Sequence, residues 1–272
     1  MAIWQAALLG VLQGLTEFLP VSSSGHLVLG QAILGIEIHD IGFEVFVHFG
    51  TLMAVLTIFK SDILLLLKGM KSLILFKYKN EDSDDEASKG LKLLGLLIIG
   101  TFPAATIGFL FKDTFEAAFS NPAFVCGSLV VTGFILFASK FANEKVMEFS
   151  PLKAFWVGLA QVVALFPGIS RSGTTITAGM ITGVKREEAA RFSFLLAIPL
   201  ILAVTLLQVF DLISHLPSGK ELVNLLIGTM FAYFSGIFAI KWLLAVVKKG
   251  WFDRFAYYCF AVGVTGLVLL SI

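Results

Sequence analysis

Residues 13–26 read Gln-Gly-Leu-Thr-Glu-Phe-Leu-Pro-Val-Ser-Ser-Ser-Gly-His, and residues 166–175 read Phe-Pro-Gly-Ile-Ser-Arg-Ser-Gly-Thr-Thr. Each stretch interrupts a long apolar run, about 1–35 for the first and 151–183 for the second. Proline and glycine stop a helix, and neither half of an interrupted run is long enough to cross a bilayer alone. We therefore predict that each run forms a re-entrant pair of half-helices.

The composition of the chain is that of a membrane protein. Of its 272 residues, 57% are hydrophobic and only 14% are charged, whereas a typical soluble domain carries about 25% charged residues. Six further apolar stretches have the roughly 17–25 residues that a helix needs to cross the hydrocarbon core. They are 43–59, 93–111, 123–140, 191–210, 222–246 and 255–271. The net charge of +1 offers no electrostatic footprint for nucleic acid.

The positions of lysine and arginine indicate how the spans are oriented. Positively charged residues accumulate on the cytoplasmic side of a membrane, and the 60–92 connection contains seven lysines. Propagating that assignment through the six spans places seventeen of the twenty Lys and Arg residues inside. Lys112 and Lys220 fall outside, and Arg171 falls within the membrane. Both termini are accordingly expected on the outer side.

The two breaks recur at a separation of 148 residues. Shifting the sequence by this offset gives seven identical pairs within 26 positions, among them Gln13 with Gln161. We therefore predict an all-α polytopic membrane protein with one domain, 1–272, built as an inverted-topology repeat of 1–147 and 148–272. Each repeat holds one re-entrant helical hairpin and three transmembrane helices. An alternative is that Gly and Ser recur only because small residues favour helix packing in lipid. That alternative explains neither why both copies are broken at the same position nor why the two copies have opposite orientations.

The tips of two such hairpins meet near the bilayer midplane. The first N–H groups of a half-helix lack intrahelical partners, so two converging N-termini form an anion site. Arg171 adds a guanidinium that can hold phosphate oxygens in a bidentate manner, and an arginine at this depth is costly enough to indicate a function. The hydroxyl groups expected to bind phosphate are those of Ser22, Ser24, Ser170, Ser172, Thr174 and Thr175.

Further side chains give this pocket reactive groups. Glu17 follows Gln13 by one helical turn, so both side chains share a face and can bind a divalent cation or orient a hydroxyl or water. His26 follows Ser23 by about one turn and can act as general acid, base or nucleophile. Glu44 is a candidate supporting or metal-binding residue near the outer end of its span.

Four other side chains receive weaker assignments. Gln161 is a candidate supporting residue through its position in the repeat, and His48, one turn deeper than Glu44, is a weaker candidate for the same role as Glu44. Tyr257 and Tyr258 are typical of an interfacial aromatic belt.

Residues 13–26 resemble the first signature of the bacitracin-resistance type undecaprenyl-diphosphate phosphatases, and residues 167–175 resemble the second. Length, hydropathy and repeat agree, so the resemblance covers the whole chain. It implies an enzyme of the bacterial cytoplasmic membrane that hydrolyses the C55 polyprenyl diphosphate to the monophosphate and inorganic phosphate, with its site facing the outer side. It also implies activity with Mg²⁺ or Ca²⁺, and no organic cofactor is expected.

Carried over by position, the resemblance implies central roles for four residues, Glu17, Ser23, His26 and Arg171. It implies phosphate contacts for Ser22, Ser170, Ser172 and Thr175. The family's first acidic position accepts Glu or Gln and is Gln13 here, which leaves Glu17 as the main acid and the candidate metal ligand.

Several alternatives stay open from the sequence. We favour Ser23 as the nucleophile, with Glu17 or His26 taking its proton, but attack by His26 or by metal-activated water is not excluded. The rival function is a lipid-phosphate transporter or flippase that uses the same anion pocket, because inverted repeats with broken helices are also a transporter architecture. The expected partners are a polyprenyl diphosphate and membrane lipid, and a homodimer is an open alternative to a monomer.

Overall fold

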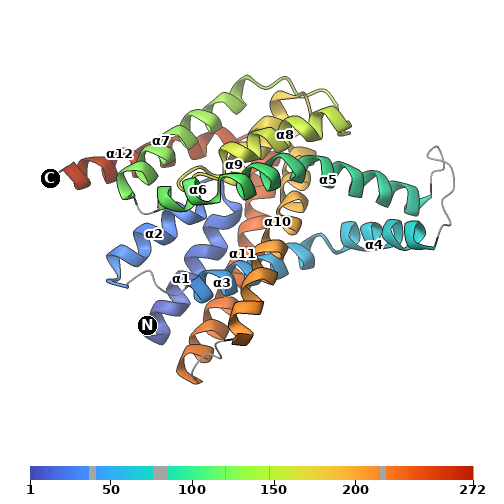
Figure 1. The fold of residues 1–272 in the computed structure, drawn as a ribbon. Helices are drawn as coiled ribbons and strands as arrows, with labels where there is room; N and C mark the ends of the chain where they lie inside the picture. The colour runs from blue at the N-terminus through green and yellow to red at the C-terminus, as the bar shows by residue number, and fades with distance from the viewer. Residues whose placement is uncertain (37–40, 76–84, 120, 147, 215–218, 272) are drawn as a thin grey trace.

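The structure is a computed structural model that describes residues 1–36, 41–75, 85–119, 121–146, 148–214 and 219–271. Within these ranges the chain forms twelve α-helices and two short 3₁₀-helices (Figure 1). They are α1 (Ile3–Phe18), α2 (Ser23–Ile33), α3 (Ile41–Ile58), α4 (Lys60–Ile74), α5 (Glu86–Leu110), α6 (Lys112–Phe119), α7 (Pro122–Ala138), η1 (Ser139–Phe141), α8 (Pro151–Val163), α9 (Arg171–Ile181), α10 (Arg186–Ser214), α11 (Gly219–Lys248), η2 (Phe252–Arg254) and α12 (Phe255–Ser271). The predicted all-α class is confirmed.

Four helical segments of the described chain are long and apolar enough to cross a membrane: α5, α7 with η1, α11, and η2 with α12. They cover four predicted spans, 93–111, 123–140, 222–246 and 255–271. Their outer surfaces carry large exposed apolar side chains, such as Phe109, Phe234 and Leu269, as expected of groups that face lipid tails. The predicted span 191–210 lies within α10. The protein is therefore a multi-pass membrane protein.

A sharp bend follows the predicted span 43–59. α4 begins directly after α3, and the two helices are bent by 85°. Asp62, in the first turn of α4, is buried and forms an ion pair with Arg191 of α10, whose Nε donates over 3.0 Å. A buried carboxylate requires such a partner, so this pair fixes α4 against α10. The 60–92 connection thus contains α4 and the first turns of α5, and 76–84 lies outside the described residues.

Both interrupted runs fold as two helices around a break. Residues 19–22 separate α1 from α2, and residues 164–170 separate α8 from α9. Each break contains one positive φ angle, +69° at Ser22 and +89° at Gly168. Such angles are easy for glycine but uncommon for other residues, so the serine is held there by its surroundings. The helix breaks are confirmed, and their re-entrant placement in a membrane stays a prediction.

Matching contacts occur at positions 148 residues apart. Ser22 Oγ accepts a hydrogen bond from the N–H of Gly25 over 3.3 Å, which caps α2. Ser170 Oγ accepts from the N–H of Gly173 over 3.1 Å and caps α9 in the same way. This correspondence supports the predicted repeat of 1–147 and 148–272.

Close helix crossings also correspond between the two halves. A Cβ atom on Gly10 would lie 2.4 Å from the carbonyl oxygen of Gly228, and one on Gly158 would lie 2.5 Å from that of Gly100. Only glycine permits these approaches of α1 to α11 and of α8 to α5. The division into two inverted repeats itself stays a prediction.

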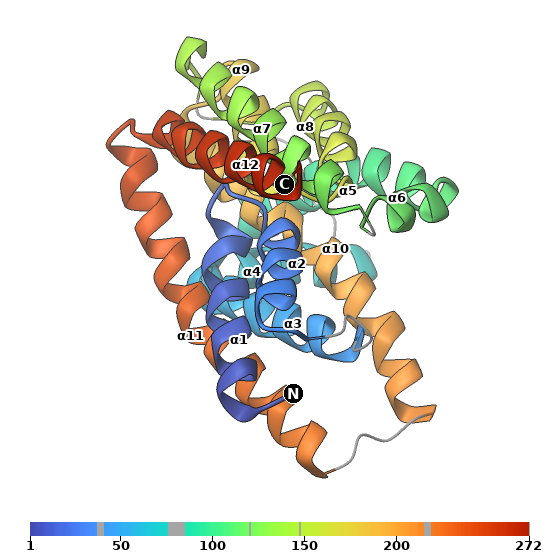
Figure 2. The ribbon, with the colours of Figure 1, turned by 90° about the vertical axis from the view of Figure 1, so that its left-hand side faces the viewer.

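Helices from opposite ends of the chain pack together. α1 packs along α11 and α11 along α3, whereas α12 packs on α7 and α8 on α5. Figures 1 and 2 show α7 and α12 side by side. The first helix therefore contacts the second half of the chain, and the last helix contacts the first half.

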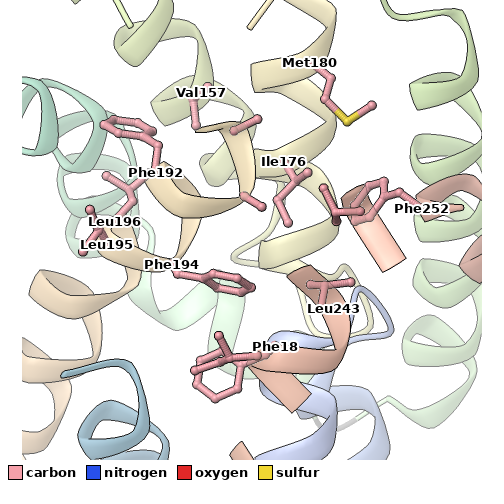
Figure 3. Close-up of a cluster of buried hydrophobic side chains, with 14 of the residues drawn as sticks. Phe18, Val157, Ile176, Met180, Phe192, Phe194, Leu195, Leu196, Leu243 and Phe252 are labelled. Carbon is pink, nitrogen blue, oxygen red and sulfur yellow. The ribbon is translucent and has the colours of Figure 1, made fainter. Parts of the chain in front are cut away.

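A buried apolar cluster joins the end of α1 and the first break to α9 and α10 (Figure 3). Phe18 and Phe194 are fully buried with their ring centroids 5.7 Å apart in an edge-to-face arrangement. Such pairs contribute about 0.5–1.5 kcal/mol beyond the burial of their area. Because Phe18 follows Glu17 and Phe194 follows Ser193, this packing also fixes the polar side chains beside it.

Candidate active site

Glu17 is the centre of a buried hydrogen-bond network between the two breaks. It lies in the last turn of α1, and its side chain is 8% exposed. Oε1 accepts a hydrogen bond from Arg171 Nη2 over 2.6 Å. Oε2 accepts from Ser23 Oγ over 2.6 Å and from Gln13 Nε2 over 3.0 Å. One carboxylate therefore joins α1 to the starts of both α2 and α9.

The two breaks also touch each other. Ser172 Oγ donates to the carbonyl oxygen of Leu19 over 3.3 Å, and a Cβ atom on Gly25 would lie 3.4 Å from Gly168 Cα. The N-termini of α2 and α9 thus approach one another. The first N–H groups of both helices lack intrahelical acceptors, and both helix dipoles are positive at these ends. The junction of the two breaks consequently suits a phosphate group.

Arg171 is held by several partners. Besides its bond to Glu17, Nη1 donates to the carbonyl oxygen of Ser193 over 3.4 Å. Thr175 Oγ1 donates to the carbonyl of Arg171 over 2.7 Å and lies 2.6 Å from Ser193 Oγ. Removing one member of a buried ion pair typically costs about 3–5 kcal/mol. Removing either Glu17 or Arg171 alone would therefore leave an uncompensated buried charge and destabilise the fold.

Four predicted phosphate-binding serines form two capping pairs. Ser22 and Ser170 are helix caps, so their hydroxyls already accept backbone hydrogen bonds. Ser24 Oγ lies 3.2 Å from Ser22 Oγ, and Ser172 Oγ lies 3.3 Å from Ser170 Oγ. The structure brings all four to the junction and shows that the two caps also have a structural role.

The two predicted phosphate-binding threonines differ from each other. Thr175 directs its hydroxyl to Arg171 and Ser193. Thr174 is buried, and its hydroxyl has no hydrogen-bond partner among the described residues. The Thr175 hydroxyl therefore bonds to the backbone of its own helix and to Ser193 of α10, and in the described part of the chain no hydrogen bond joins it to the Arg171 guanidinium.

His26 faces Tyr258 of α12. His26 Nδ1 lies 2.9 Å from the carbonyl oxygen of Ser22, and because a carbonyl only accepts, Nδ1 carries the proton. Nε2 lies 2.7 Å from the Tyr258 hydroxyl, and the two rings are stacked. In the described part of the chain no hydrogen bond joins His26 to Ser23. Glu17 is therefore the group placed to accept the serine proton.

His48, the weaker candidate on the same span as Glu44, lies beside the Glu17 carboxylate. Its Nε2 is 3.7 Å from Glu17 Oε2, and its Nδ1 donates to the carbonyl oxygen of Glu44 over 2.7 Å. The Glu44 carboxylate accepts from Gln31 Nε2 over 3.2 Å. The backbone of Glu44 thus holds His48 beside the Glu17 carboxylate, and the supporting roles of Glu44 and His48 stay predictions.

Gln161 lies outside this network. It is fully buried in α8, and neither atom of its amide has a hydrogen-bond partner among the residues that the structure describes. Its counterpart Gln13 bonds to Glu17 four residues later, whereas Leu165 stands four residues after Gln161. The second half lacks the carboxylate that would give this amide a role, so its assignment as a supporting residue finds no contact in the structure.

The residues at Glu17 do not fit a resident divalent cation. Mg²⁺ and Ca²⁺ require several oxygen ligands. Both oxygens of Glu17 already accept hydrogen bonds, one of them from the positively charged Arg171. Among the described residues, no three His, Cys, Asp or Glu side chains are grouped as a metal site. The predicted role of Glu17 as a metal ligand therefore has no support in this arrangement.

Several residues that hold the site carry no local sequence signal. Thr132 of α7 donates to the carbonyl of Gly168 over 2.9 Å and accepts from the N–H of Ser170 over 3.0 Å. Ser193 of α10 contacts Arg171, and Tyr258 of α12 contacts His26. Each acts from a helix distant in sequence, so no spacing within a motif could reveal it.

The polar junction lies within a region that matches a known family. The model for "Bacitracin resistance protein BacA" matches residues 6–265, which include both breaks. The chain belongs to the BacA family. The resemblance noted in the sequence is thereby confirmed, and the Glu17–Ser23–Arg171 network lies wholly within the BacA match.

Named relatives align with this BacA-family chain over nearly its full length. An "Undecaprenyl-diphosphatase" of Halothermothrix orenii is 42% identical over 275 residues, covering 100% of each chain. One of Salinibacter ruber is 43% identical over 277 residues, covering 99% of this chain and 100% of its own. One of Methanobrevibacter smithii is 40% identical over 272 residues, covering 97% of this chain and 96% of its own.

Proposed function

We propose that this protein hydrolyses undecaprenyl diphosphate to undecaprenyl phosphate and inorganic phosphate. The relatives named undecaprenyl-diphosphatase support this substrate. The observation that carries the proposal is the 2.6 Å hydrogen bond from Ser23 Oγ to Glu17 Oε2, beside the guanidinium of Arg171. A nucleophile, its base and an anion-binding group thus lie together where two helix N-termini meet.

In the first proposed step, Ser23 Oγ attacks the terminal phosphorus and Glu17 takes its proton. The Oγ–P bond forms while the P–O bond to undecaprenyl phosphate breaks, so the lipid monophosphate leaves with the bond electrons. Ser23 is the hydroxyl that the structure places on a carboxylate, and it is only partly buried. His26 is less suited to attack because its Nε2 already contacts the Tyr258 hydroxyl.

Arg171 and the two helix starts would stabilise the transferring phosphoryl group. Most catalysis of phosphoryl transfer comes from positioning and from offsetting charge on the equatorial oxygens. Arg171 offers planar N–H donors, of which one now bonds to Glu17. When Glu17 accepts the serine proton it becomes a weaker acceptor for this donor, which favours transfer of the guanidinium to phosphate oxygens.

In the second proposed step, water attacks the phosphorus of phosphorylated Ser23. The P–Oγ bond breaks, and Oγ takes back the proton that Glu17 holds. Both protons of the attacking water stay on the inorganic phosphate, which leaves as H₂PO₄⁻. The chain returns to its starting state, which balances the reaction.

We propose that the protein acts in the bacterial cytoplasmic membrane with its site toward the outer side. The lipid tail would stay in the bilayer, and the product would return to carrying precursors for peptidoglycan. The distribution of lysine and arginine supports this orientation.

Cysteine labelling in intact cells tests the orientation. The native Cys126 and Cys259 are buried, so they give little background. A membrane-impermeant maleimide is expected to label Lys112→Cys, on exposed α6, without permeabilisation. Lys145→Cys, also at an exposed position, should react only after permeabilisation. The reverse pattern would contradict the proposed orientation.

Phosphate release by the purified protein tests the function. In detergent, the protein is expected to release one inorganic phosphate per undecaprenyl diphosphate and leave the monophosphate, identified by mass spectrometry. The protein is also placed in vesicles to test the rival transporter function. Movement of the lipid phosphate across the vesicle without phosphate release would contradict the proposal.

A further inference from the structure

His26 and Tyr258 form a contact between residues 232 positions apart in the sequence. The Tyr258 hydroxyl lies 2.7 Å from His26 Nε2, and the ring centroids are 5.7 Å apart with an interplanar angle of 13°. Since Nδ1 donates its proton to the Ser22 carbonyl, Nε2 of the neutral ring is an acceptor and the tyrosine hydroxyl is the donor. Both nitrogens of the imidazole are therefore occupied, which fixes its tautomer and its orientation.

The position of Tyr258 is set by the packing of α12. The next residue, Cys259, is buried and its Sγ lies 3.6 Å from the carbonyl oxygen of Pro20 in the first break. This contact places the start of α12 directly on that break. The neighbouring Tyr257 is 62% exposed, against 45% for Tyr258, and the described residues give it no hydrogen-bond partner. The two adjacent tyrosines thus differ in exposure and in contact with His26.

The contact connects α12 to the reactive serine through a short chain of bonds. Tyr258 bonds to His26, and His26 bonds to the carbonyl of Ser22. Ser22 has a φ angle of +69° and directly precedes Ser23. A non-glycine residue in that conformation must be held by its surroundings. The imidazole therefore helps to hold the backbone that presents the Ser23 hydroxyl to Glu17.

We propose that Tyr258 is a positioning residue that acts on turnover through His26; this inference rests on the proposed phosphatase function. A tyrosine hydroxyl can donate to a neutral imidazole and accept from an imidazolium. Tyr258 can therefore keep His26 in one orientation in either protonation state. It holds the first break in the geometry in which Ser23 bonds to Glu17, and it makes no contact with the phosphate itself.

Matched phenylalanine variants test this role. Tyr258→Phe keeps the stacked ring and removes only the hydroxyl. It is expected to lower kcat by about tenfold, as for the loss of one hydrogen bond. KM should change by less than about twofold. Tyr257→Phe is the control and should match wild type. Unchanged kcat in Tyr258→Phe would overturn the proposal. A raised KM with unchanged kcat would also overturn it, because it would indicate a substrate contact.

A double-mutant cycle tests whether the effect passes through His26. In a His26→Gln background, Tyr258→Phe is expected to cause no further loss. A further tenfold loss there would mean that the tyrosine acts independently and would overturn the positioning role.

Nitrogen NMR of histidine-labelled protein gives a readout that needs no substrate. The His26 signals are assigned by their loss in His26→Gln, and they should show a protonated Nδ1 and a hydrogen-bonded Nε2. The Nε2 signal should shift in Tyr258→Phe but not in Tyr257→Phe. If the Nε2 signal does not move, the contact is absent and the proposal fails. If wild type releases no phosphate while the shift is present, the phosphatase function fails and the contact stands.

Discussion

Replacement of Ser23 by alanine is expected to reduce phosphate release from undecaprenyl diphosphate by about 1,000-fold, because the nucleophile is lost. The residual rate would come from the anion site, which Arg171 and the helix starts still form. The fold should persist, since Ser23 is partly exposed and the Glu17 oxygen it leaves still accepts a hydrogen bond from Gln13. Initial rates in detergent measure the loss, and thermal unfolding checks the fold.

A second serine provides the control for this variant. Among the described residues, the Ser271 hydroxyl bonds to the carbonyl of Val268 alone, at the exposed end of α12, and Ser271→Ala should retain wild-type turnover. Acid-quenched wild-type protein should carry phosphate on a peptide from residues 13–26, and Ser23→Ala should not. Turnover by Ser23→Ala within tenfold of wild type would show that water or His26 attacks phosphorus directly.

Substitution of Arg171 by lysine is expected to lower kcat by about 100-fold although the positive charge is kept, as for loss of a preorganised charge-stabilising donor. The guanidinium bonds to Glu17 through one nitrogen and to the Ser193 carbonyl through another. A lysine ammonium is a single point of charge, so it cannot keep both bonds and hold phosphate oxygens. Steady-state kinetics with undecaprenyl diphosphate give kcat and KM separately.

The control for Arg171→Lys is the same substitution at an exposed site. Arg254 of η2 is exposed and lies over the ring of Trp251. Arg254→Lys should leave turnover within about twofold of wild type. Should Arg171→Lys also stay within that range, the bidentate role of the guanidinium would be disproved.

Local signals in the sequence predict the breaks and the two central charged residues. Pro20, Pro167 and Gly168 end helices through their own backbone chemistry, so the positions of both breaks follow without tertiary information. Glu17 and Arg171 are costly in a membrane, so each was a candidate site residue from the sequence alone, but their direct pairing was not predicted. The structure pairs them directly.

Contacts between distant helices were not predictable in the same way. The bend between α3 and α4 lies at Phe59, which is neither proline nor glycine and so gives no sign of a bend in the sequence. The buried Asp62–Arg191 ion pair accounts for the direction of α4. Tyr258 is typical of an interfacial aromatic residue in the sequence, and nothing near it in the sequence indicates that it contacts His26.

The roles of the serine hydroxyls depend on local geometry as well as on their type. Ser22 and Ser170 were predicted as phosphate ligands because they stand at helix starts. At an N-cap, however, a serine hydroxyl first satisfies a backbone N–H of its own helix. Ser23 is one residue further along and points to Glu17 instead. A shift of one position therefore separates the cap from the proposed nucleophile.

The pairing of Glu17 with Arg171 leaves the lipid-free centre electrically neutral. A diphosphate head carries more negative charge than one guanidinium can offset, and surplus charge at low dielectric is costly. The two helix N-termini offset part of this charge, and protons or cations drawn from the aqueous side would offset the rest. The affinity of the protein for its lipid should consequently depend on the ionic composition outside the membrane as well as on the protein's own side chains.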